Sequence, residues 1–265
     1  MNDFRNLDGR SPQELRRQNP VLNVPSVVVW FIAVLVAVQG LRQAIGPEAD
    51  EWVLFTFAFI PARFAPPPEL ANFVFPGPPG ARWWSFVTHM LLHGDWMHLI
   101  INSIWMLAFG SVLARRLGSA RFLIVSAASA AAGAAASLAL HWGAELTVLV
   151  GASGAISGQL AGAVRLMFAE GGSLATLGRQ RLDRVRALSL VETFRTPRAL
   201  MFLAVWFAIT IFTGAISFGP PGEEARIAWE AHVGGFLAGL VLFGLFDRDF
   251  PNMSRSKDVD DGKSC

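Results

Sequence analysis

Residues 228–246 read AWEAHVGGFLAGLVLFGLF, a run that is apolar except for two residues near its start, one of them His232. A helix rises about 1.5 Å per residue, so this run is long enough to cross a hydrocarbon core about 30 Å thick. Ala231, Gly235 and Gly239 recur at every fourth position, the spacing at which small residues let two transmembrane helices approach closely. The stretch therefore predicts a membrane-spanning helix that contacts another helix tightly and carries a histidine into the bilayer.

The composition of the whole chain is typical of a membrane protein. Of its 265 residues, 53% are hydrophobic and only 16% are charged, whereas soluble domains carry about 25% charged residues. The net charge of +2 is too small and too scattered to indicate nucleic-acid binding. The single cysteine, Cys265, is the last residue, so the sequence predicts neither a disulfide framework nor a cysteine metal site.

Five further apolar runs precede this one, each about as long as a membrane-spanning helix requires. Together the runs predict spans at residues 23–44, 96–114, 122–140, 147–168, 199–218 and 228–246. The first run follows a long polar segment and ends without an A-x-A-like cleavage site, so we interpret it as a retained helix rather than a signal peptide. The sequence thus predicts an all-α membrane protein built as a six-transmembrane-helix bundle.

The basic residues predict how this bundle is oriented. Most of the 22 Lys and Arg residues lie before the first span, between spans two and three, between spans four and five, and after the last span. Because cytoplasmic connections carry an excess of basic residues, we expect both termini to be cytoplasmic. The connection over residues 45–95 then faces outside, and its many Pro, Phe and Trp residues predict a long loop that lies in the membrane interface.

These boundaries divide the chain into three parts. Residues 1–22 form a cytoplasmic N-terminal segment, residues 23–248 form the six-helix domain, and residues 249–265 form a cytoplasmic tail. The tail is polar and acidic, so we expect it to be solvated and disordered.

Three polar side chains fall at the same predicted depth. Counting about 1.5 Å per residue from the charged end of each span places Asn102, Ser153 and His232 roughly 20–25 Å above the cytoplasmic boundary. Polar groups inside a bilayer are costly and often functional, so we expect one site in the outer third of the membrane that opens to the outer side. A serine hydroxyl needs a neighbouring base to become a nucleophile. Glu230 lies two residues from His232 and points to another helix face, so the sequence predicts a Ser–His dyad.

Each of these residues also has a simpler interpretation. Ser153 is a small residue that fits a helix interface, and Asn102 is able to bond a neighbouring helix. His232 is equally suited to a buried hydrogen bond, a metal site or a proton relay. The three residues at one depth, together with the G-x-S-G sequence around Ser153, favour catalysis over these alternatives.

Three motifs give the chain a close resemblance to the rhomboid family of intramembrane serine proteases. They are H-x-x-x-N at His98–Asn102, G-x-S-G at residues 151–154, and A-H-x-x-G-x-x-x-G at residues 231–239, in the family's order and on the expected helices. The start of the second span matches the bacterial form of the family at His89, His93, His98, Asn102 and Trp105. The resemblance covers roughly residues 25–246.

This resemblance implies a role for each motif residue. Ser153 is similar to the family's nucleophile and His232 to its general base, while His98 and Asn102, with the Ser153 backbone N–H, correspond to its oxyanion hole. The expected activity is hydrolysis of peptide bonds in or near the transmembrane segments of other membrane proteins. The implied partners are such substrates and the lipid bilayer, with no nucleic acid, metal or cofactor, and the implied location is a bacterial inner (cell) membrane.

The chain departs from the family pattern at two positions. The family's Trp-Arg pair in the first outer loop reads Trp84-Ser85 here, and Ala114 replaces a glutamate that is frequent near the end of the second helix. We expect these changes to alter loop anchoring and hydrogen bonds within the bundle rather than catalysis. Arg165 is the one charge well inside a predicted span, and we expect it to extend to the cytoplasmic surface.

Three other functions are compatible with parts of this pattern. His89 and His93 have i, i+4 spacing and suit a metal site if they lie on a helix, but the zinc-protease H-E-x-x-H motif is absent. An inactive rhomboid-like protein binds membrane clients without cutting them, although such proteins typically lack the Ser or the His. A transporter that uses His98 and His232 as proton carriers does not require G-x-S-G.

Overall fold

The computed structural model describes residues 24–142, 146–170, 172, 182, 185–215 and 228–247. The predicted terminal segments, 1–22 and 249–265, lie outside the described residues. The described chain is helical, apart from an isolated antiparallel bridge between Phe59 and Leu149. Its α-helices are α2 (Ser26–Ala44), α3 (Pro47–Phe57), α4 (Ala81–Thr88), α5 (Trp96–Trp105), α6 (Ser111–Leu117), α7 (Ser119–Leu140), α8 (Ser153–Met167), α10 (Leu190–Arg195), α11 (Pro197–Ala215) and α12 (Trp229–Phe246).

Four described helices are long and apolar enough to cross a membrane. They are α2, the continuous helix Trp96–Leu117, α7 and α12, and they correspond to predicted spans one, two, three and six. The helix Trp96–Leu117 joins α5 to α6 through a short π-helix, η4 (Met106–Gly110). Predicted span five corresponds to α11, which is apolar over Pro197–Phe212.

Predicted span four begins later than the sequence indicated. Its helix, α8, starts at Ser153 rather than at residue 147. The preceding residues do not form a helix, because Leu149 pairs with Phe59 and Gly151 adopts a positive φ of 115°. At 15 residues α8 is shorter than the spans above, so the count of six spans stays a prediction.

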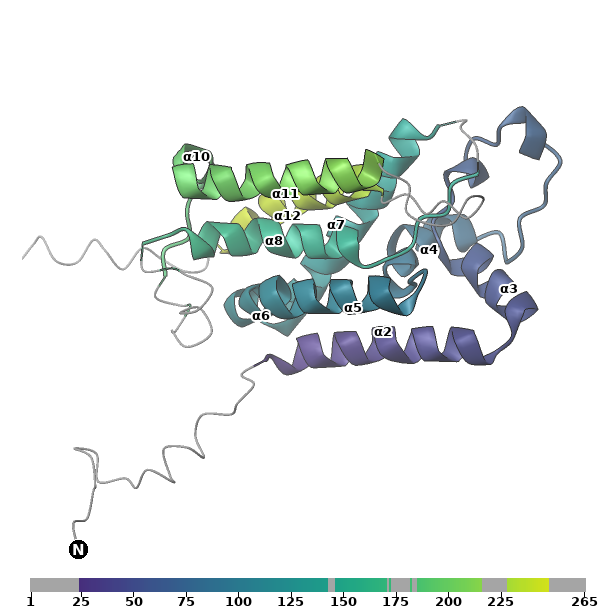
Figure 1. Cartoon of the computed structure of the whole chain (residues 1–265), viewed down its shortest axis with the longest axis horizontal. Coiled ribbons are helices and arrows are strands. Elements are labelled where there is room, and N and C mark those ends of the chain that lie inside the picture. The colour runs from purple at the N-terminus through teal and green to yellow at the C-terminus, as the bar shows by residue number, and fades with distance from the viewer. Residues whose placement is uncertain are drawn as a thin grey trace, which may run out of the picture.

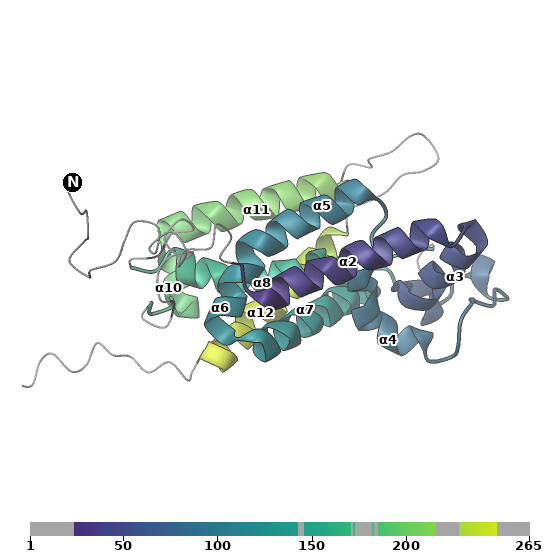
Figure 2. The ribbon, with the colours of Figure 1, turned by 90° about the horizontal axis from the view of Figure 1, so that it is seen from below.

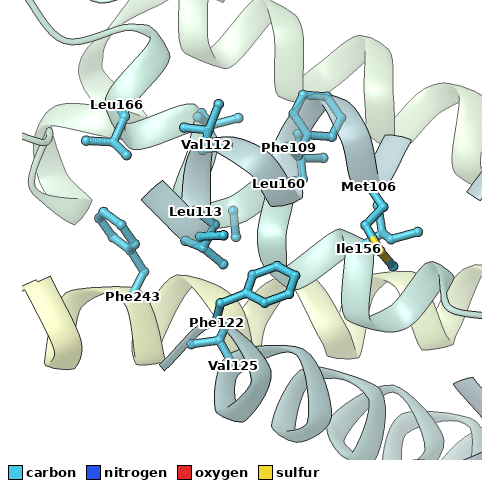
Figure 3. Packing of buried hydrophobic residues seen from close by; sticks show 14 of the residues in the cluster. Met106, Phe109, Val112, Leu113, Phe122, Val125, Ile156, Leu160, Leu166 and Phe243 are labelled. Atoms are coloured by element: carbon cyan, nitrogen blue, oxygen red, sulfur yellow. The ribbon is translucent and has the colours of Figure 1, made fainter. Parts of the chain in front are cut away.

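The long helices run roughly side by side (Figures 1 and 2), and α7, α8 and α12 pack against one another. The purple helix α2 lies along the edge of the bundle beside α5 and α6, while α3 and α4 gather at one end. Apolar side chains from the second span, α7, α8 and α12 meet between these helices (Figure 3). Phe122 of α7 and Leu113 of α6 are fully buried there, as is Phe243 of α12.

The contact between α8 and α12 depends on glycine. A Cβ atom on Gly235 would overlap the backbone of Gly154, and one on Gly239 would overlap the backbone of Gly158. The small-residue spacing therefore predicted this close approach correctly. Gly162 does not extend this row, because a Cβ there would lie 2.6 Å from Leu113 Cδ1 and 2.8 Å from Phe243 Cδ2.

The connection over residues 45–95 is folded rather than extended. It contains α3, α4 and the 3-10 turns η1 (Pro61–Arg63), η2 (Pro68–Leu70) and η3 (His89–Leu91). Arg63 donates hydrogen bonds to the carbonyls of Phe55 and Pro76 and lies over the Phe75 ring. Trp84 Nε1 donates to Thr56 O at 3.0 Å. Side chains within the connection thus satisfy its backbone carbonyls.

Buried arginines hold the end of the bundle opposite Ser153. Arg116 of α6 pairs with Asp247 at 2.6 Å, just after the end of α12. Arg165 was expected to extend to the surface, and this was wrong: the residue is only 7% exposed. Its guanidinium donates to Leu188 O at 2.6 Å and lies 4.8 Å from the centre of the Phe243 ring. The Arg165 guanidinium thus contacts a backbone carbonyl and an aromatic ring instead of the water that we expected. Ala114 is buried in the apolar cluster at the same end.

A methyl group on Gly235 should separate the two helices, whereas one on Gly40 should not. Gly235→Ala places Cβ against the backbone of Gly154, which has no freedom to rotate away, so we expect the free energy of unfolding to fall by about 1–3 kcal/mol. A Cβ atom on Gly40 in α2 would have nothing within 4 Å. Gly40→Ala should therefore raise stability by roughly 0.5–1 kcal/mol through helix propensity. Thermal unfolding in detergent measures both, and equal stability of the two variants would contradict the tight contact.

Candidate active site

Ser153 is the first residue of α8 and follows a sharp turn at Gly151. The φ of 115° at Gly151 is strained for any residue with a side chain. A Cβ atom there would also lie 2.8 Å from His98 Nε2 and 3.6 Å from Asn102 Nδ2. The turn that starts α8 therefore lies directly against the His98 and Asn102 side chains of α5.

Backbone hydrogen bonds fix this turn. The Gly151 N–H donates to His89 O at 3.0 Å, and the Ala152 N–H donates to His93 Nε2 at 3.5 Å. The next amide, that of Ser153, opens α8, where the first N–H groups have no acceptor within the helix.

His89 contacts this turn through its backbone carbonyl, and His93 contacts it through its ring. His89 Nδ1 lies 2.9 Å from Ser85 O, while the His93 ring meets the His98 ring edge-on with centroids 5.1 Å apart. The 3-10 turn η3 ends at Leu91, so the two histidines do not share a helix and the premise of a metal pair is not met. In the described part of the chain no group of three or more His, Cys, Asp and Glu side chains suits a metal ion.

Burial keeps His89 and His93 neutral at physiological pH. It lowers the pKa of His93 to about 3, an effect that nearby His98 and Arg42 reinforce. Burial also lowers the pKa of His89 to about 4. The hydrogen bond to Ser85 raises this pKa and offsets part of the effect of burial. A neutral His93 has the lone pair that the Ala152 N–H requires.

Asn102 offers an unused hydrogen-bond donor. The residue is only 4% exposed, and its Nδ2 has no hydrogen-bond partner among the described residues. Leaving a buried donor unpaired costs about 1–3 kcal/mol. Proteins tolerate such a group most readily where a ligand oxygen later accepts the bond. Within the described residues Asn102 Nδ2 therefore makes no bond to another helix, and the same holds for other buried atoms such as His93 Nδ1.

The sequence interpretation missed Asp95, which sets the position of His98. Asp95 is the N-cap of α5, and its Oδ1 accepts a hydrogen bond from the His98 backbone N–H at 2.8 Å. An aspartate just before an apolar helical run is a recognisable N-cap signal. This signal identifies the residue that fixes the start of α5.

His232 lies in the first turn of α12 with one ring nitrogen already engaged. Nδ1 lies 3.0 Å from Ala228 O, so it must carry the proton, and Nε2 keeps a lone pair that is able to accept one. A Cβ atom on Gly154 would lie 3.4 Å from Ala231 O. The residue after Ser153 thus contacts the residue before His232.

Glu230 does not take part in this contact. Its carboxylate accepts a hydrogen bond from Ser137 Oγ at 3.2 Å and lies 3.7 Å from His141 Nδ1, both at the end of α7. As predicted from helix geometry, Glu230 faces away from the side of α12 that carries His232. The arrangement groups Ser153, His232, His98 and Asn102 at one end of the bundle, without Glu230.

The family model of the rhomboid domain matches residues 80–248, from the start of α4 to beyond the end of α12. The chain belongs to the rhomboid family. This membership and the apolar helices identify it as an integral membrane protein.

Curated relatives carry rhomboid protease names. The putative rhomboid protease YdcA of Bacillus subtilis (strain 168) is 41% identical over 87 residues, which cover 31% of this rhomboid and 40% of the relative. The rhomboid protease GlpG of Yersinia pestis (strain Pestoides F) is 28% identical over 159 residues, 60% of this rhomboid and 46% of the relative. This rhomboid therefore spans less than half the length of these curated relatives.

Acid should destabilise the folded rhomboid through His93. The unfolded chain binds a proton on this residue near pH 6.5, whereas the folded chain binds one only near pH 3, so stability falls as the pH drops below 6.5. Between pH 7 and pH 5 this difference corresponds to about 2 kcal/mol. His93→Gln should reduce the fall in melting temperature over this range, with a remainder due to His89. An unchanged pH dependence in the variant would contradict a neutral, buried His93.

Proposed function

We propose that this rhomboid is an intramembrane serine endopeptidase that hydrolyses peptide bonds in or near transmembrane segments of other membrane proteins. The contact between Gly154 and Ala231 carries this proposal, because it brings α8 and α12 together at the reacting residues. His232 Nδ1 is committed to Ala228 O, which leaves Nε2 for the hydroxyl of Ser153. The protease names of the relatives support the same reaction class.

The reaction begins with proton transfer within the dyad. His232 Nε2 takes the proton of Ser153 Oγ as the oxygen attacks the scissile carbonyl carbon. Negative charge then develops on the carbonyl oxygen. The Asn102 amide, the His98 ring and the Ser153 backbone N–H stabilise this oxyanion by hydrogen bonding, and the N-terminus of α8 adds its positive dipole end.

Collapse of the tetrahedral intermediate completes the first half of the reaction. The C–N bond breaks, and His232 donates its proton to the leaving amine. The acyl group remains on Ser153 until a water molecule, deprotonated by His232, attacks it. The second collapse releases the carboxylic acid and returns the proton to Ser153. No step uses a metal or a cofactor.

The membrane arrangement forms part of the proposal. Residues 23–248 make up a six-span domain in which α8 and α11 also cross the bilayer. Both termini are cytoplasmic, following the arginine distribution. The active site opens to the outer side of a bacterial inner membrane, and the partners are the bilayer and transmembrane protein substrates.

One observation favours an enzyme over a client-binding rhomboid without activity. The buried Nδ2 of Asn102 has no partner among the described residues, and it lies against the Gly151 turn, two residues before Ser153. An oxyanion hole requires such a donor. Incubating the purified protein in detergent with a panel of single-span proteins, and mapping any cut by mass spectrometry, tests the proposal. A transporter instead predicts ion-coupled flux in proteoliposomes without cleavage.

Ser153→Ala and His232→Ala should each abolish cleavage and labelling by a fluorophosphonate probe. Because the two residues act as one unit, the double variant should be no worse than either single variant. Ser153→Ala should change the free energy of unfolding by less than about 1 kcal/mol. Cleavage rates, labelling and melting temperatures are measured on the same preparations. Multiplicative losses in the double variant would argue against a dyad.

Asn102→Ala should lower kcat much more than it raises KM, since its donor acts only after attack begins. Losing one oxyanion donor costs roughly 10²–10³-fold in kcat in other hydrolases, and His98 and the backbone N–H moderate the effect here. Ser103→Ala is the matched control, because Ser103 bonds only Leu99 O in its own helix in the described structure. Kinetics and melting temperature are compared for both variants. A large loss of stability in Asn102→Ala with kcat intact would assign Asn102 a structural role.

A further inference from the structure

The first turn of α12 carries a second polar contact that the proposed reaction does not use. Glu230 is only 4% exposed although it is an acidic residue. It lies on the α7 side of α12, two residues before His232. A buried carboxylate requires hydrogen-bond or ionic partners, and here both partners come from the end of α7.

The contacts around Glu230 form a closed cluster. Ser137 Oγ donates to Glu230 Oε1 at 3.2 Å. His141 Nδ1 lies 3.7 Å from the same oxygen and 3.0 Å from Ser137 O. The His141 side chain is about a third exposed, so the cluster reaches from the buried interface to the surface of the bundle.

This cluster contains serine, histidine and glutamate, but it is not a second catalytic triad. His141 Nδ1 faces a backbone carbonyl at hydrogen-bond distance, so it carries a hydrogen and has no lone pair for the Ser137 hydroxyl. The hydroxyl donates directly to the carboxylate instead. The geometry is that of a link between two helices.

Close backbone contacts make this link rigid. A Cβ atom on Gly133 of α7 would lie 2.6 Å from Ala231 O, and one on Gly234 would lie 2.6 Å from Ala132 O. The residues on both sides of His232 thus rest against α7 without intervening side chains. A carboxylate in the first turn of a helix is also favoured by the helix dipole.

We propose that Glu230 is a positioning residue that fixes the rotation of α12 and so aims His232 Nε2 at Ser153. Two residues correspond to about 200° around a helix, so holding Glu230 on α7 turns His232 toward α8. The inference rests on the proposed function, because it takes Ser153 and His232 as the reacting pair. A displacement of 1 Å in a catalytic group lowers a rate by roughly 10²-fold. Loss of the link between Glu230 and α7 should therefore slow the reaction of Ser153.

Four variants of the full-length protein test this role. Glu230→Ala removes the link, while Glu230→Gln keeps an acceptor for Ser137 in nearly the same volume. Ser137→Ala removes the donor alone. Ser126→Ala is the matched control, because Ser126 is also buried in α7 but bonds Phe122 O and Gln159 rather than α12.

The readouts are the maximal rate of Ser153 labelling by a fluorophosphonate probe, the probe concentration at half-saturation, and the melting temperature. Glu230→Ala should lower the maximal rate at least about tenfold, with half-saturation within about twofold. Glu230→Gln should stay within about threefold of the parent protein because the hydrogen bond persists. Ser137→Ala should lower the rate, and combining it with Glu230→Ala should cause no further loss. Ser126→Ala should lower the melting temperature but not the rate.

Different experimental results would contradict this inference and the proposed function. If the parent protein labels at Ser153 and Ser137→Ala labels equally fast, the link does not position His232. Rate losses that track melting temperature across all variants, Ser126→Ala included, would also overturn it. If Glu230→Ala does not fold, Ser137→Ala and Glu230→Gln decide the question. Absence of labelling in the parent protein would instead contradict the proposed function.

Discussion

The close approach of α8 and α12 is the constraint on which the rest of the structure depends. Gly154 and Gly158 meet Gly235 and Gly239 with their backbones in contact, and no side chain separates them. Contact over this row fixes the relative height of the two helices. Ser153 begins one helix and His232 lies in the first turn of the other, so the height of each residue is set by glycines deeper in the bundle.

A second constraint follows from burying polar groups among apolar helices. Because an unpaired polar group costs free energy, hydrogen bonds to backbone groups hold several of the polar side chains near Ser153. The His89 carbonyl and the His93 ring accept hydrogen bonds from the consecutive amides of Gly151 and Ala152, and Asp95 caps α5. The Nδ2 of Asn102, like the Nδ1 of His93, has no partner among the described residues. An oxyanion hole needs hydrogen-bond donors that are rigidly held but have no partner before the substrate binds. Rigid neighbouring residues keep such a donor from bonding another protein group.

The sequence predicted the features that depend on local pattern. Apolar runs located the long helices, and the four-residue spacing of small residues predicted that the last span contacts another helix tightly. It did not predict the start of α8, because that start depends on the pairing of Leu149 with Phe59, far away in the chain. Nor did it predict the burial of Arg165, whose partner Leu188 O lies in a later segment. The link of Ser137 and His141 to Glu230 has no sequence pattern either, since its members are brought together only by folding.

The two departures from the family pattern concern residues at which this chain folds without the family's usual side chain. Ser85 stands where the family has an arginine, yet its carbonyl accepts from His89, and Arg63 supplies hydrogen bonds to Phe55 O and Pro76 O in the same connection. Ala114 stands where a glutamate is frequent, and it packs in the apolar cluster of the bundle. Folding requires a hydrogen-bond or ionic partner for each buried backbone carbonyl or charge. A residue at a different position in the sequence is able to supply that partner. The turn at Gly151 allows no such exchange, because both its φ and the nearby His98 ring exclude any side chain.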